Sequence, residues 1–186
     1  MTGAKMETSE QEKTVRKLLI LATLLLAFTT LASAQSAPKP DWSPFNWLIG
    51  TWDGSGSGKP GSGGGSFSLL YSLDHAVLVR KNRSDYPATK GQPAIHHQDL
   101  MVVYSENDKW RADYWDNERH VIHYAVAIGE GTATFVSDKS ATAPTYRLTY
   151  KRLAKGDLSI EFAIAPPGSD DFKTYTTGTC HRRQGT

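Results

Sequence analysis

The sequence predicts an all-β fold, an up-and-down antiparallel barrel of about ten strands with a short helical turn plugging one end. After residue 43, short runs of alternating apolar and polar residues are separated by turn residues. Most connections are short, which favours a meander over the long crossovers of a Greek key. A meander leaves two edges unpaired unless it closes on itself, so we expect closure.

The N-terminal segment has the pattern of a secretory signal peptide. Basic residues precede an apolar run at 18–32, and Ala32 and Ala34 are the small residues that a signal peptidase requires. The run is shorter than the roughly 20 apolar residues of a membrane span. We therefore expect export to the periplasm or out of the cell. The expected organisation is a signal peptide at 1–34, a flexible leader at 35–42 and the barrel domain at 43–186.

The barrel is expected to begin with its plug. Ser43 and Pro44 suit the start of a helical turn that places Phe45 and Leu48 on one side, and the first strand follows with Trp52 pointing inward. The run at 54–65 is so rich in glycine and serine that we expect its middle to be a flexible connection between the first two strands, because it has few side chains to bury.

The remaining strands follow from alternation and turn signals. Residues 84–98 contain two prolines and a glycine and are interpreted as a long loop. The strands expected after the glycine-rich run are 66–73, 75–83, 99–105, 109–116, 119–128, 132–136, 145–153, 157–165 and 172–182.

Composition argues against several classes of partner. The formal net charge is only +2 and no basic stripe is present, so neither nucleic acid nor an anionic membrane surface is an expected partner. Cys180 is the only cysteine and is interpreted as a small buried strand residue. We expect a monomer or weak dimer, without stable membrane insertion after signal cleavage.

The six histidines do not predict a metal site. His96 and His97 are adjacent, and His120 and His123 are separated by an odd spacing, so each pair points to opposite faces of a strand. No zinc-site spacing and no catalytic motif is present, so we name no metal ligand and no catalytic residue. An acid–base pair of Tyr with His, or of Asp113 or Asp116 with His120 or His123, remains open.

Pairing of neighbouring strands predicts an interior wall. An even-numbered loop between 99–105 and 109–116 places Met101, Trp110 and Tyr114 on one face. A two-residue turn at 117–118 then adds His123 to this face, whereas a three-residue turn adds His120 and Tyr124, because a slip of one residue reverses every side chain. Arg80 could anchor an anionic ligand if it points inward. The candidates for the ligand-binding wall are Arg80, Met101, Trp110, Tyr114, His120, His123 and Tyr124.

The opening phrase Trp47-Leu48-Ile49-Gly50-Thr51-Trp52, with the glycines after it, resembles the calycin superfamily. The closer likeness is to bacterial lipocalin-like and nitrobindin-like domains. The resemblance implies that a basic residue of the last strand, Arg182 or Arg183, packs over Trp52 and closes the barrel floor. Nitrobindin-like proteins bind heme through a histidine of the final strand. Here that strand has only His181 at its very end, so no cofactor is expected, with heme as the alternative.

These observations predict an exported barrel that holds a small, mostly apolar or amphipathic ligand non-covalently. One alternative is a heme-binding nitrobindin-like protein, and another is a small-molecule isomerase or hydrolase built on the barrel. A purely structural module would instead have an interior packed solid with large side chains.

Overall fold

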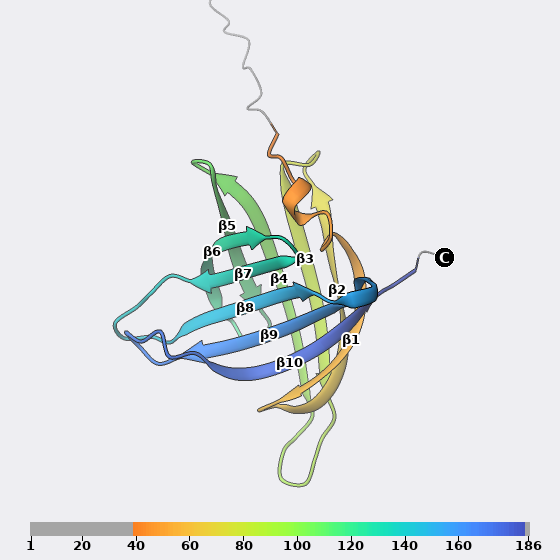
Figure 1. The fold of residues 1–186 in the computed structure, drawn as a ribbon. Helices are drawn as coiled ribbons and strands as arrows, with labels where there is room; N and C mark the ends of the chain where they lie inside the picture. The colour runs from red at the N-terminus through yellow and green to blue at the C-terminus, as the bar shows by residue number, and fades with distance from the viewer. Residues whose placement is uncertain (1–38, 185–186) are drawn as a thin grey trace, which may run out of the picture. The chain divides into compact units, whose positions relative to one another are not determined.

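The computed structural model describes residues 39–184, in which ten antiparallel strands close into one barrel (Figure 1). Each strand pairs with the next along the chain and the last pairs with the first, which confirms the predicted all-β up-and-down barrel. The expected signal peptide at 1–34 and residues 35–38 of the leader lie outside the described residues. The strands are β1 (Gly50–Gly58), β2 (Gly61–Ser72), β3 (Val77–Tyr86), β4 (Ile95–Glu106), β5 (Lys109–Asp116), β6 (Val121–Gly129), β7 (Thr132–Ser137), β8 (Thr145–Arg152), β9 (Leu158–Ala165) and β10 (Lys173–Arg182).

Helical structure is confined to two 3-10 turns within residues 39–184, η1 (Ser43–Phe45) and η2 (Ala154–Gly156). In this part of the chain no helix has the length and apolar character needed to cross a membrane.

The glycine-rich run is a β-hairpin, so the expectation of a flexible connection was wrong. β1 pairs along its full length with the part of β2 from Gly61 to Leu69, across a turn at Lys59 and Pro60. The backbone ladder forms without any contribution from side chains, and it requires glycine here because the neighbouring strands come very close. A Cβ atom on Gly56 would lie 2.2 Å from the Thr177 carbonyl oxygen, and one on Gly65 would lie 2.1 Å from that of Arg83. Glycine therefore permits the close approach of this hairpin to the neighbouring strands β10 and β3.

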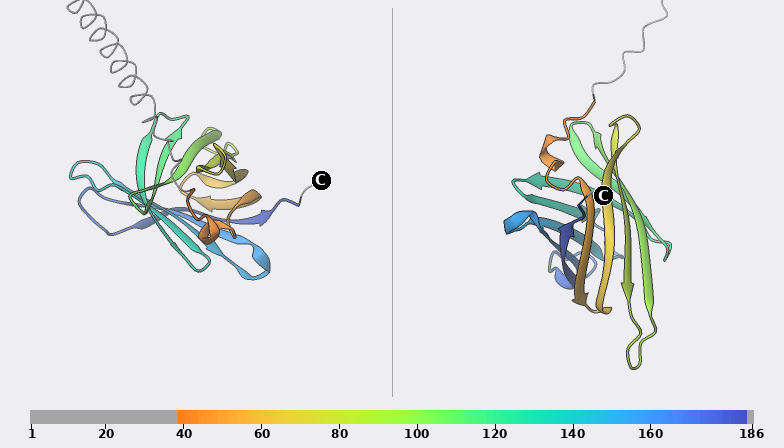
Figure 2. Two further views of the ribbon diagram at one scale, coloured as in Figure 1. Left: turned by 90° about the horizontal axis from the view of Figure 1, so that it is seen from above. Right: turned by 90° about the vertical axis from the view of Figure 1, so that its right-hand side faces the viewer.

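The expected long loop at 84–98 is also shorter than predicted. β3 continues to Tyr86 and β4 begins at Ile95, with these two residues paired. The two prolines fall in the connection between them, where they disturb no ladder hydrogen bond. This hairpin extends beyond the rest of the barrel in both side views (Figures 1 and 2).

The plug begins earlier than predicted. Trp42, which was assigned to the flexible leader, is buried and packs with its ring centroid 4.6 Å from that of Trp110. Its indole nitrogen donates a hydrogen bond of 2.8 Å to the carbonyl oxygen of His75. Phe45 from η1 packs edge-on against the same Trp110 ring. The packed domain therefore includes Trp42, because its aromatic surface is covered by the barrel end.

Trp52 closes the floor beneath the plug. Its side chain is fully buried, and its indole nitrogen donates to the Leu48 carbonyl oxygen at 3.0 Å. The Arg182 guanidinium lies 4.3 Å from the centroid of the Trp52 ring and donates to the Trp47 carbonyl oxygen at 3.0 Å. Of the two arginines considered, Arg182 holds this position, while Arg183 pairs with Asp53 on the outside.

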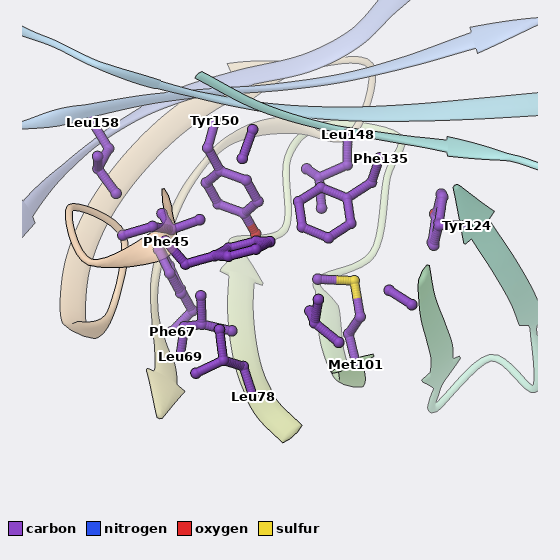
Figure 3. Close-up of a cluster of buried hydrophobic side chains, with 14 of the residues drawn as sticks. Phe45, Phe67, Leu69, Leu78, Met101, Tyr124, Phe135, Leu148, Tyr150 and Leu158 are labelled. Carbon is purple, nitrogen blue, oxygen red and sulfur yellow. The ribbon is translucent and has the colours of Figure 1, made fainter. Parts of the chain in front are cut away.

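The apolar core fills the half of the barrel next to the plug. Figure 3 shows Phe45, Phe67, Leu69, Leu78 and Tyr150 among the side chains that converge there, from η1, β2, β3 and β8. The floor is thus packed solid, and any space for a ligand has to lie towards the other end.

Candidate ligand cavity and its polar network

A cavity of about 720 Å³ lies inside the barrel, on the far side of the packed core from the plug. Part of its wall has no side chains, because β1, β2 and β10 present glycines to the interior. On β1, Trp52 fills the floor, whereas Gly54 and Gly56, two and four residues further on the same face, leave the space open. The glycines that line the cavity are Gly54, Gly56, Gly63, Gly64, Gly65 and Gly178.

A second wall is apolar and largely aromatic. Tyr146 of β8 and Phe162 of β9 are stacked at 5.9 Å with an interplanar angle of 10°. Tyr175 meets Phe162 edge-on at 6.1 Å. Strand pairing produces this arrangement, because Phe162 is opposite Leu148 and so lies diagonally across from Tyr146 on the same face of the sheet. Further apolar lining comes from Ile122, Tyr124, Leu148 and Ile160.

The polar side of the cavity is centred on an ion pair between Arg80 and Asp99. Only 7% of the Arg80 side chain and 3% of the Asp99 side chain are exposed. The other Asp99 oxygen accepts a hydrogen bond of 2.9 Å from the Asn82 amide and lies 3.3 Å from His97 Nε2. Burial lowers the pKa of Arg80, but the Asp99 carboxylate and the neighbouring tyrosines together outweigh burial and raise this pKa. Because Asp99 already neutralises it, Arg80 is not the free anion anchor that the sequence suggested.

The network continues through Tyr114 towards the open rim. His97 Nε2 lies 3.1 Å from the Tyr114 hydroxyl, which donates to Asp116 Oδ2 at 3.3 Å. Asp116 Oδ2 also lies 2.8 Å from His120 Nδ1. The backbone N–H groups of Glu118 and His120 both donate to Asp116 Oδ1 at 2.9 Å, so this carboxylate organises the whole β5–β6 turn.

The pKa shifts follow from burial and from these contacts. Burial, with the nearby Asp99 and Asp116 carboxylates, raises the pKa of Tyr114, so its phenol stays neutral and can donate. The hydrogen bond to Asp99 raises the pKa of His97 against the opposing effect of burial, and Glu118 adds to the increase. Burial alone would raise the pKa of Asp116, but the contacts with His120 and the backbone hydrogen bond from Glu118 together outweigh burial and lower this pKa.

The β5–β6 turn decides which histidine faces the cavity. Tyr114 pairs with Ile122, which is the register of a three-residue turn, and Arg119 takes the left-handed conformation with φ of 74°. His120 and Tyr124 therefore line the cavity. His123 was wrongly placed on the wall by the two-residue alternative. It lies on the outer face, with its Nδ1 2.7 Å from Asp113.

Two other wall candidates belong to the packed half of the barrel. Met101 and Trp110 have the predicted orientation, since Met101 pairs with Tyr114 and Trp110 with Ser105. Met101 is fully buried in the core, however, and Trp110 packs on the plug residue Trp42. The wall candidates that line the cavity are therefore Arg80, Tyr114, His120 and Tyr124.

Sequence reasoning missed part of the polar network. His97 and Asp99 alternate with Met101 on β4 and share its inward face, but residues up to 98 had been interpreted as a loop. Extending that strand back by two residues would have identified His97. Asn82 likewise alternates with Arg80 on β3. Asp116 was named in advance only as a possible acid–base partner of His120 or His123, and it does contact His120. Its role in the network comes from the shape of the turn that follows it, which the sequence did not predict.

The described residues contain no cluster of three or more His, Cys, Asp or Glu side chains suited to a metal ion. A heme ligand on the final strand, as the family resemblance implies, does not fit the cavity either. His181 is the histidine of β10, and it lies outside with its Nδ1 2.9 Å from Asp157. Cys180 does line the cavity, and burial raises the pKa of its thiol to about 11, so it stays protonated at neutral pH.

Neither a family model nor a curated protein matches this chain.

Proposed function

We propose that this chain is an exported binding protein that holds one small, mostly apolar ligand with a polar group non-covalently inside the barrel. The observation that carries this proposal is the cavity of about 720 Å³ beyond a solidly packed floor. A module with a purely structural role gains stability by filling its interior. Here glycines leave the interior open on one side.

The division of the cavity wall supports an amphipathic ligand. Apolar and aromatic side chains cover most of one side, and a fixed polar network covers another, which is the usual composition of a small-molecule site. A ligand of about 20 non-hydrogen atoms that gains about 0.3–0.4 kcal/mol per atom would bind with about 6–8 kcal/mol. That corresponds to a dissociation constant in the micromolar range.

Catalysis is the second candidate, favoured by one observation. His97 and Tyr114 form an inward acid–base pair at 3.1 Å. Both ring nitrogens of His97 already face partners, Tyr114 and Asp99 on one side and Glu118 on the other. These contacts suit a network that holds the wall in shape, and for this reason we propose binding and not turnover.

The proposal is tested with the neutral fluorescent probe N-phenyl-1-naphthylamine on the signal-free protein. We expect saturable one-to-one binding with a rise in fluorescence. Leu148→Trp, which places a larger side chain on the cavity wall, should weaken binding at least about tenfold because it occupies the space of the probe.

The matched control is Leu153→Trp, because Leu153 is exposed after β8 and does not line the cavity. Circular dichroism should show that both variants keep the barrel. Absence of saturable binding to the wild type, or equal weakening in both variants, would overturn the proposed function.

A further inference from the structure

With the histidines neutral, the charges on the cavity wall are unbalanced towards the negative. Arg80 is the only Lys or Arg among the lining residues, and Asp99 already neutralises it. Asp116 and Glu118 are the remaining charged lining residues, apart from three histidines. A carboxylate ligand would meet repulsion from these two groups, whereas a cation would be attracted.

The two remaining carboxylates differ in what they can offer a ligand. Only 4% of the Asp116 side chain is exposed, and both of its oxygens accept hydrogen bonds from the β5–β6 turn or from Tyr114. The Glu118 side chain is 52% exposed, and its Oε1 lies 3.1 Å from His97 Nδ1. Its Oε2 has no hydrogen-bond partner among residues 39–184. Glu118 is therefore the carboxylate with a free oxygen at the cavity.

The aromatic wall favours the same charge. Tyr86, Tyr146, Phe162 and Tyr175 all line this cavity, and the face of an aromatic ring attracts a cation electrostatically. The same rings provide apolar surface for the body of a ligand. Aromatic side chains and an available carboxylate that line one cavity are a combination suited to an organic ammonium ion.

Building on the proposed function, we infer that the ligand is a protonated amine with an apolar or aromatic body. Its ammonium group is held by Glu118, and its body lies against the wall formed by Tyr146, Phe162 and Tyr175. The rest of the polar network keeps Glu118 in place through His97 and the turn anchored by Asp116.

Three compounds with one shared body test this inference: 2-(2-naphthyl)ethylamine, 2-(2-naphthyl)ethanol and 2-naphthylacetic acid. Calorimetric titration at pH 8 and low salt should show the amine binding at least about fivefold more tightly than the alcohol, with the acid weakest. Added salt should reduce the advantage of the amine and leave the affinity for the alcohol unchanged, because only the charged contact is screened.

Glu118→Gln should bring the affinity for the amine down to that for the alcohol, without changing the latter. The matched control is Glu130→Gln, since Glu130 lies at the β6–β7 turn and does not line the cavity. This variant should bind all three compounds as the wild type does.

The outcomes separate this inference from the proposed function. Equal binding of the three compounds, or tightest binding of the acid, overturns the amine assignment and leaves the proposed function intact. An amine preference that survives Glu118→Gln assigns the ammonium ion to a different group and also overturns the inference. If none of the compounds binds and the neutral naphthylamine probe also fails, both proposals fall.

Discussion

Removing Asp99 should destabilise the barrel more than any other single change in the polar network. In Asp99→Ala the Arg80 guanidinium stays inside a wall where only 7% of its side chain is exposed, with its charge uncompensated. Breaking a buried pair from one side costs about 3–5 kcal/mol. The amide of Asn82 and the Nε2 of His97 also lose their contact with this carboxylate.

This loss is a large fraction of the 5–15 kcal/mol typical of a folded domain. For a domain of this size it corresponds to a melting temperature lower by about 10 °C. Urea unfolding followed by tryptophan fluorescence measures the change directly, because Trp42 and Trp52 are buried in the native state.

The double variant Arg80→Leu/Asp99→Leu separates the loss of the pair from the unpaired charge. Replacing both partners with apolar residues removes the need to bury a charge, so most of the lost stability should return. A loss below about 1 kcal/mol in Asp99→Ala would refute the reasoning, because it would mean that water in the cavity hydrates Arg80 adequately. A double variant no more stable than Asp99→Ala would refute it as well.

Two further predictions concern the floor and the pH dependence. Arg182→Ala removes the contact with Trp52 and the hydrogen bond to the Trp47 carbonyl, so the free energy of unfolding should fall by about 1–2 kcal/mol. Arg183→Ala removes only a surface ion pair with Asp53 and should leave this free energy nearly unchanged. Equal losses in urea unfolding would contradict this. Because the folded-state pKa of His97 is raised, its stabilising contribution is fully present below the unfolded value of about 6.5 and is lost as pH rises through the folded pKa. His97→Gln should therefore be most destabilised relative to wild type at pH 5.5 and least at pH 9, and a difference that is constant or grows with pH would exclude this role.

Local features of the sequence sufficed to predict most of the strands and the closure of the barrel. Alternation along residues such as those of β5 is a property of each segment, and its predicted bounds, Lys109–Asp116, are those observed. Closure follows because ten short strands in a meander would otherwise expose two edges. The glycine-rich hairpin was missed because its stability comes from neighbours, β3 and β10, and not from its own side chains.

The site was less predictable than the fold. Whether His120 or His123 points inward depends on the length of the β5–β6 turn, which includes Arg119 as a third residue. No sequence pattern predicted the positive φ of Arg119. Nothing in the sequence around Asp99 distinguishes it from other strand residues. Only the pairing of β3 with β4 brings it next to Arg80 and Asn82. Cross-strand neighbours of this kind are far apart in the chain, so local reasoning does not bring them together.

By itself, therefore, the sequence determined that the chain forms a plugged β-barrel, because alternation, turn residues and the aromatic opening motif act over a few residues at a time. Only the tertiary structure decided where the barrel is hollow, which histidines enter it and which charges there are already neutralised. Those properties depend on the register and curvature of the closed sheet, in which one residue of shift exchanges the inner and outer faces.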